Sequence, residues 1–199
     1  TDNQISELPA ELGYCTRLQK LMLSGNQLCA LPKEMAACTQ IELLRIAANR
    51  FTVLPEWLFS QPRLSWLAYA GNPYCEISEN NALAQNPIKK IHWRHLELQH
   101  KLGEGASGVI HQAEWQHALE KKTNVAVKLF KGALTSDGLP HSEKAACIGA
   151  GSHPNLIAVH GKIHEHPTDS KGLIMSLIKP DFCNLADPPS LASCTRDIY

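Results

Sequence analysis

Residues 102–110 read LGEGASGVI and place Gly103, Gly105 and Gly108 in the pattern G-x-G-x-x-G. Because glycine has no Cβ, such a turn lets the backbone come close to the phosphate groups of a nucleotide. The pattern alone is a weak indication, since several nucleotide-binding folds and ordinary glycine turns share it. The elements on either side of the turn must therefore decide what it binds.

Three apolar runs surround the turn and predict strands: HLELQHKL before it, GVIHQAEW directly after it, and NVAVKLF at residues 124–130. In a dinucleotide-binding fold the glycines would open a helix, and an acidic residue would follow about 20 residues later. A strand in place of that helix argues against a dinucleotide-binding fold. The turn is instead expected to join two strands.

This arrangement resembles the small lobe of a protein kinase, whose signature is G-x-G-x-x-G-x-V followed by V-A-I-K. Residues 103–110 fit the first motif, and residues 125–128 fit the second. The resemblance implies that Lys128 supplies a positive charge to the α- and β-phosphates of ATP, while Ile110 and Ala126 form an apolar roof over adenine. A glycine hairpin beside an ordinary strand lysine is the alternative. The resemblance implies ATP contacts along the whole turn, at Leu102, Gly103, Glu104, Gly105, Ala106, Ser107 and Gly108.

The resemblance also implies a helical glutamate that holds the lysine, and Glu143 is the best candidate. It precedes the His-Pro-Asn turn at residues 153–155 by one residue more than the family pattern leads us to expect, and a solvated residue near a helix N-terminus is the alternative. The runs NLIAVHGKIHE and GLIMSLI predict two further strands, joined by the turn HPTDSKG. By resemblance, Met175 is the gatekeeper behind adenine, Leu177 lies in the hinge at residues 176–178, and SLASCTRDIY begins the next helix.

Three histidines, His160, His164 and His166, fall on alternate positions here and could face the same way as metal ligands. Exposed strand histidines are common, and no fourth ligand is apparent in the sequence. We therefore expect surface side chains at these positions and no metal site.

The motifs that complete phosphoryl transfer in kinases are absent from these 199 residues. The family orients the substrate hydroxyl and holds magnesium with His-Arg-Asp-x-x-x-x-Asn and Asp-Phe-Gly. The DFC at residues 181–183 follows the predicted hinge too closely for that role, and the HWRH at residues 92–95 precedes the glycines and lacks the aspartate. We expect the Mg²⁺ ligands and catalysis in a large lobe beyond Tyr199, so that this chain is a piece of a longer protein.

A second pattern occupies the first part of the chain, where asparagines recur every 23 residues at Asn3, Asn26, Asn49 and Asn72. Apolar residues keep the same spacing before the last three asparagines, and Leu-Pro pairs follow the first three. This pattern resembles the leucine-rich repeat, L-x-x-L-x-L-x-x-N-x-L, over residues 3–77. The resemblance implies a solenoid in which stacked neighbours share one core, with each asparagine amide bonding to the backbone of the turning chain.

In such repeats, the residues that alternate with the buried strand leucines face outward on the concave side. We expect this face to bind a protein partner, and an ordinary solvated sheet surface is the alternative. The expected contact residues form two rows, with Lys20, Leu43 and Trp66 in one and Met22, Arg45 and Ala68 in the other.

Composition limits the kinds of partner and compartment. With 19 basic and 19 acidic residues, the chain has no net field that would attract nucleic acid or an anionic membrane. Seven cysteines without a Cys-x-x-Cys pair indicate reduced thiols in a cytosolic protein. No run of about 20 apolar residues occurs, and residues 76–94 are too charged to span a membrane, so both parts are expected in one compartment, the cytoplasm.

Together these patterns predict an α/β plus α+β chain. A leucine-rich-repeat solenoid is expected at residues 1–77, a linker at 78–95, and the mainly antiparallel β small lobe and hinge of a protein kinase-like fold at 96–199. The chain resembles an intracellular leucine-rich-repeat protein kinase of bacterial or protist type, which uses ATP to phosphorylate protein hydroxyls. The alternative is a non-catalytic scaffold or pseudokinase, in which the repeats bind and the kinase-like lobe only relays a conformational state.

Overall fold

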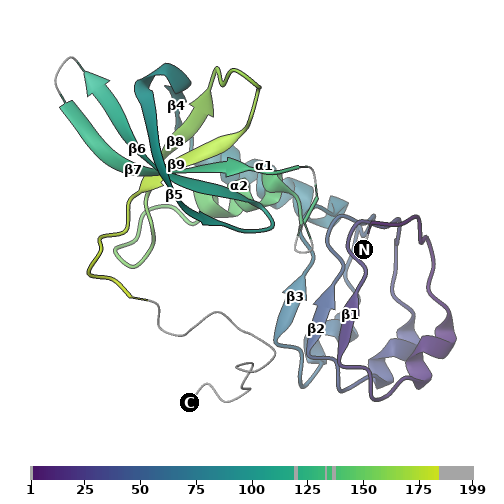
Figure 1. Ribbon diagram of the computed structural model, residues 1–199. Helices are drawn as coiled ribbons and strands as arrows, with labels where there is room; N and C mark the ends of the chain where they lie inside the picture. The colour runs from purple at the N-terminus through teal and green to yellow at the C-terminus, as the bar shows by residue number, and fades with distance from the viewer. Residues whose placement is uncertain (1, 119–120, 133, 136–137, 184–199) are drawn as a thin grey trace.

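The computed structural model describes residues 2–118, 121–132, 134–135 and 138–183, which form two parts (Figure 1). The first part is built on a three-stranded parallel sheet and the second on a six-stranded sheet. Helix α1 (Pro73–Gln85) and helix α2 (Pro140–Gly149) lie next to each other where the two parts meet. The helix predicted at residues 190–199 lies outside the described residues.

The first part repeats one unit of strand, turn and 3₁₀ helix. Strands β1 (Lys20–Met22), β2 (Leu43–Arg45) and β3 (Trp66–Ala68) are parallel, and paired residues such as Lys20 and Leu43 are 23 positions apart in the chain. The 3₁₀ helices η1 (Ala10–Tyr14), η2 (Lys33–Ala37) and η3 (Glu56–Ser60) each begin directly after a proline, whose fixed φ suits a helix start. The stacked units share one core, whose buried members include Leu28, Met35, Ile41, Leu44, Phe51 and Leu58.

The repeating asparagines satisfy the backbone where the chain turns out of each strand. Asn49 Nδ2 donates hydrogen bonds to the carbonyl oxygens of Leu23 and Ile46 at 3.0 Å, and Asn49 Oδ1 accepts one from the Leu28 N–H at 3.0 Å. Leu23 and Leu28 belong to the preceding unit, so the side chain joins two turns of the stack. Asn72 continues this pattern, because its Oδ1 accepts from the Asn49 N–H at 3.1 Å. An amide can do this because it both donates and accepts.

The predicted linker at residues 78–95 is not a plain connection. Helix α1 begins at residue 73 and occupies its first half, and strand β4 (Lys89–His92) and the 3₁₀ helix η4 (Trp93–His95) follow. A Cβ on Gly149 would lie 3.0 Å from Ala82 Cβ, so α1 and α2 approach closely through small residues. The segment therefore packs against the second part at both of its ends, because β4 also pairs with a strand of the six-stranded sheet. The polar composition of residues 78–95 gave no indication of this packing.

The six-stranded sheet has the order β4-β8-β9-β7-β6-β5. All pairs are antiparallel except β4 with β8, which agrees with the prediction of a mainly antiparallel lobe. Buried Val125, Val127 and Ile174 lie at its centre. Helix α2 follows β7 and precedes β8 in the chain. The strands not yet given are β5 (Leu96–Glu104), β6 (Gly108–Ala118), β7 (Lys121–Phe130), β8 (Val159–His164) and β9 (Gly172–Ser176).

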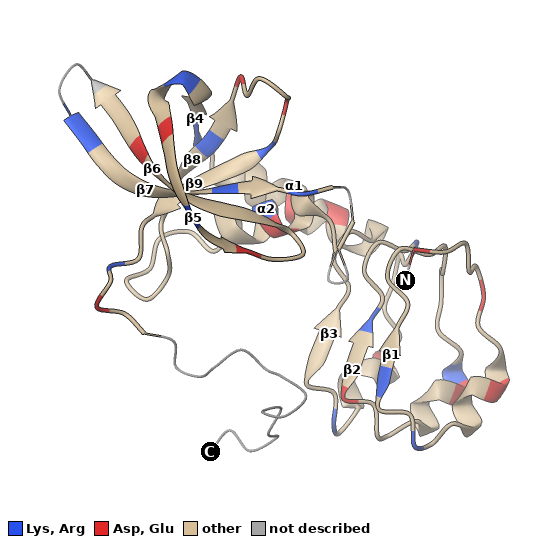
Figure 2. Cartoon of the chain, viewed as in Figure 1, with Lys and Arg blue, Asp and Glu red and all other residues tan. Residues whose placement is uncertain are grey.

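Charged residues of both signs are spread over both parts of the chain (Figure 2). This distribution agrees with the equal numbers of basic and acidic residues. Binding of a charged ligand must therefore depend on individual charged groups and not on the net charge of the chain. Within the described ranges, no helix combines the length and apolar character that crossing a bilayer requires.

Candidate functional site

Lys128 and Glu143 meet although they come from different elements. Lys128 lies on β7 and Glu143 in the first turn of α2. Lys128 Nζ donates hydrogen bonds to Glu143 Oε1 and, at 2.9 Å, to Ser107 Oγ in the glycine turn. The side chains of Lys128 and Glu143 are 15% and 34% exposed, so water screens their attraction less than that of the surface ion pairs. An ammonium group is thereby held at a defined place beside the glycine turn.

The three glycines of the turn differ in what surrounds them. A Cβ on Gly108 would lie 2.5 Å from the Leu129 carbonyl oxygen, so the β6–β7 pairing itself requires glycine there. A Cβ on Gly103 or Gly105 would meet no atom within 4 Å. The packing of the chain therefore does not explain these two glycines. They leave open space along the turn, as a cradle for a bound group would.

Lys131 fixes the glycine turn, a role that the sequence did not predict. Its backbone N–H donates to the Ser107 carbonyl oxygen at 2.9 Å, and its Nζ donates to the Glu104 carboxylate. Lys101 donates to the same carboxylate at 2.9 Å. The hydrogen bonds from Lys131 and Lys101 lower the pKa of Glu104 to about 2. The carboxylate of Glu104, predicted to contact ATP, is thus engaged with two lysines of the lobe.

An apolar pocket of about 260 Å³ lies beside the glycine turn. Its walls come from β5, β6, β7 and β9, because adjacent strands bring distant residues side by side: Ala126 pairs with Met175 across β7 and β9. Ile157, which precedes β8, also lines it and was not predicted, since an apolar residue in a predicted strand carries no mark of binding. The predicted residues that the pocket brings together are Leu102, Gly103, Ile110, Ala126, Met175 and Leu177.

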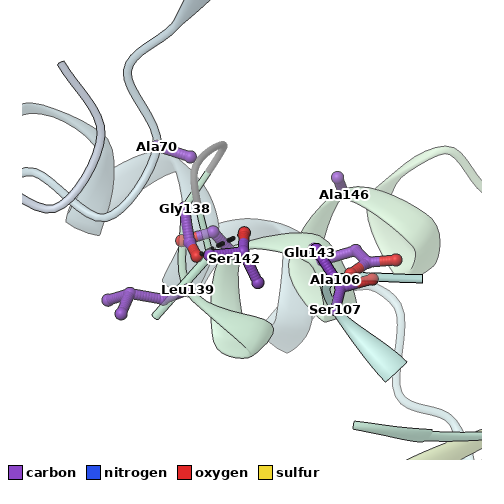
Figure 3. Close-up of a pocket in the computed structure, with 9 residues that line it drawn as sticks. Ala70, Ala106, Ser107, Gly138, Leu139, Ser142, Glu143 and Ala146 are labelled. Atoms are coloured by element: carbon purple, nitrogen blue, oxygen red, sulfur yellow. Dashed lines mark hydrogen bonds between the residues drawn. The ribbon is translucent and has the colours of Figure 1, made fainter. Parts of the chain in front are cut away.

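Glu143 also lines a second cavity, of about 470 Å³ (Figure 3). Ala106 and Ser107 of the glycine turn line one end, and Ala70, from the end of the last repeat, lines the other. Ser142 Oγ is buried in its wall without a hydrogen-bond partner among the described residues. The sequence could not predict this cavity, because it joins residues about 70 positions apart in the chain.

The three histidines weighed as metal ligands do not converge. His160 Nε2 lies 3.0 Å from Ser176 Oγ, and the His166 ring packs against Trp93 with centroids 4.1 Å apart. His164 instead faces His92, with ring centroids 4.8 Å apart. Each histidine therefore has a different neighbourhood.

One face of the parallel sheet carries most of the residues predicted to contact a partner. Lys20, Leu43 and Trp66 pair in register, as do Met22, Arg45 and Ala68. The Arg45 guanidinium lies 5.7 Å from the centre of the Trp66 ring, and Trp66 is 51% exposed. The prediction that Ala68 contacts a partner is wrong, because Ala68 is only 7% exposed.

Residues 96–181 match a family model described as protein tyrosine and serine/threonine kinase. The matched segment contains the glycine turn, the Lys128–Glu143 pair and the apolar pocket. The second part of the chain is therefore similar to a part of a protein kinase domain. The match does not extend to the repeats at the start of the chain. No curated protein matches the chain.

Proposed function

We propose that the chain binds ATP in its kinase-like lobe and is the nucleotide-binding part of a protein kinase that phosphorylates protein hydroxyl groups. The observation that carries this proposal is the ammonium group of Lys128, which Glu143 and Ser107 hold beside a glycine turn. The fit to ATP is supported by two surfaces of different character. The apolar pocket of about 260 Å³ suits a base, and the open space at Gly103 and Gly105 suits phosphates.

When bound, ATP supplies the phosphoryl group that is transferred. Lys128 then neutralises phosphate charge, and Glu143 keeps its side chain in place. Gly103 and Gly105 let the backbone of the turn approach the phosphates. Ile110, Ala126, Met175 and Leu177 enclose the base on its apolar faces. The family uses Mg²⁺ with ATP, and its magnesium-binding motifs do not occur in this sequence.

Calorimetric titration of the chain with ATP tests this assignment through Lys128→Met. Removing one charge-assisted contact should weaken binding about 10-fold to 100-fold. Lys122→Met is the matched control, because exposed Lys122 lies on the same strand and pairs with Glu114, away from the glycine turn. ATP affinity that stays unchanged in Lys128→Met, or falls equally in Lys122→Met, would contradict the role of Lys128. In a longer chain that contains the large lobe, Lys128→Met should abolish phosphate transfer.

We further propose that the first part is a leucine-rich-repeat array that binds a protein partner through its concave face. The exposed Trp66 and the Arg45 beside it support this, because tryptophan and arginine dominate binding energy at protein interfaces. The expected contact residues are Lys20, Met22, Leu43, Arg45 and Trp66.

A partner purified with the wild-type chain should lose at least about 10-fold in affinity to Trp66→Ala. Tyr14→Ala is the control, because Tyr14 is 83% exposed and lies on η1, outside the parallel sheet. Equal affinity of wild type and Trp66→Ala would remove the concave face from the proposal.

A further inference from the structure

A second group of side chains capable of chemistry lies at the β4 edge of the six-stranded sheet, away from the nucleotide pocket. His92 ends β4, His164 ends β8, and Glu165 follows directly. The parallel register pairs His92 with His164, so the two imidazoles leave the sheet on the same face. Their ring centroids are 4.8 Å apart.

The carboxylate of Glu165 lies against both imidazoles. Its Oε2 is 3.1 Å from His92 Nδ1, and its Oε1 is 3.4 Å from His164 Nε2. One nitrogen from each ring and a carboxylate oxygen all lie within 4.8 Å of one another. In a tetrahedral zinc site with bonds of about 2.0 Å, ligand atoms are ~3.3 Å apart. With one oxygen of Glu165 as the ligand, the three ligand atoms have to approach one another by at most ~1.5 Å to reach this value.

Glu165 has an unusual backbone conformation, which agrees with a functional role for these three side chains. Its φ is 57°, in the left-handed region that residues other than glycine seldom occupy. Such strained positions tend to persist where the site has a function. The strand ends there, and the side chain returns toward the imidazoles of both neighbouring strands. The side chains of His92, His164 and Glu165 are 35%, 38% and 62% exposed, so an ion can reach them from solvent.

We propose that His92, His164 and Glu165 form a Zn²⁺ site, with water in the fourth position. Two imidazoles and one carboxylate are a ligand set that zinc accepts, whereas Mg²⁺ and Ca²⁺ prefer oxygen ligands alone. His92 would bind through Nδ1 and His164 through Nε2, each as a neutral imidazole. His95, whose ring centroid is 5.8 Å from that of His92, packs against the first ligand and restricts its rotation.

The metal would link β4 to the end of β8. Because β4 follows α1 in the chain and forms one edge of the sheet, this link would hold the segment that joins the repeats to the kinase-like lobe. His92 and Glu165 are 73 positions apart, so a bridge between them would close a long loop of the chain. The inference does not depend on ATP binding or phosphate transfer.

The test is a calorimetric titration of the metal-free chain with ZnCl₂ in the presence of a phosphine reductant. Wild type should bind one Zn²⁺ that excess Mg²⁺ and Ca²⁺ do not displace. His92→Ala should weaken this binding by about 100-fold or more, since even outer partners of metal ligands contribute 10–100-fold. Glu165→Gln should weaken it at least about 10-fold, and its exposed position makes loss of folding an inadequate explanation.

His100→Ala is the matched control, because His100 is an exposed histidine on β5, at the opposite edge of the same sheet. It should bind Zn²⁺ like wild type. Excess Zn²⁺ should also raise the melting temperature of wild type and His100→Ala by more than that of Glu165→Gln. Zinc affinity and stoichiometry that are the same in wild type, His92→Ala and Glu165→Gln would overturn the proposal and assign the bound metal to cysteines or other histidines.

Discussion

Alanine substitutions at two glycines of the same turn should affect different properties: Gly108→Ala should lower stability, and Gly105→Ala should lower ATP affinity. In Gly108→Ala, the new methyl group would lie 2.5 Å from the Leu129 carbonyl oxygen and 3.2 Å from Lys128 Cε. Backbone atoms cannot approach that closely, so β6 or β7 has to move. Overpacking of this kind costs about 1–3 kcal/mol. For a chain of 199 residues, a loss of ~2 kcal/mol lowers the melting temperature by ~4–8 °C.

Gly105→Ala should leave stability unchanged or slightly higher. The methyl group meets no atom within 4 Å, and Gly105 is not among the glycines with positive φ. Alanine also loses less backbone entropy on folding, which is worth about 0.4–1 kcal/mol at compatible positions. The same methyl group occupies the space that we assign to the phosphates. ATP affinity should therefore fall about 10-fold in this stable variant.

Two measurements on each variant separate these effects. Urea unfolding followed by tryptophan fluorescence gives the free energy of unfolding, and calorimetry gives ATP affinity. Gly108→Ala with wild-type stability would show that the contact with Leu129 does not constrain the sheet. Gly105→Ala with wild-type ATP affinity would show that the turn does not cradle phosphates.

Two further predictions concern single side chains. Asn49→Ala leaves the buried Leu28 N–H without its acceptor and removes one of two donors from the Leu23 and Ile46 carbonyl oxygens, so the free energy of unfolding should fall by about 1–3 kcal/mol in urea. Asn81→Ala, at an exposed position in α1, should leave it unchanged, and equal effects would refute the asparagine's role. The pKa of Glu104 is lowered to about 2 by Lys131 and Lys101, so its contribution to stability is complete above pH 4.5 and is lost as pH falls toward 2. In an NMR titration its midpoint should lie below 4.5 and rise in Lys131→Ala; an ordinary midpoint in wild type would contradict the contact.

Local sequence was sufficient to predict the strands on both sides of the glycine turn. Alternating and continuous apolar runs identified β5, β6, β7, β8 and β9, since burial of one face imposes that periodicity. The helix that carries Glu143 was predicted from the kinase resemblance, and α2 contains that residue. Residues 78–95 were predicted to be a linker, because their polar composition does not show which small residues pack. Ala82 and Gly149 make the contact between α1 and α2, and neither is distinctive by itself.

The sequence alone determined the 23-residue period, the order of the two parts, and the residue types able to bind phosphate and base. Those features depend only on residue types and their spacing along the chain, so they can be recognised without a structure. Only the tertiary structure decided that Glu143 reaches Lys128, that Ala68 is buried, and that Lys131 and Lys101 occupy the carboxylate of Glu104. It also placed His92 beside His164 and Glu165. Strand register and helix packing bring such residues together, and their separation in the sequence does not indicate their distance in space.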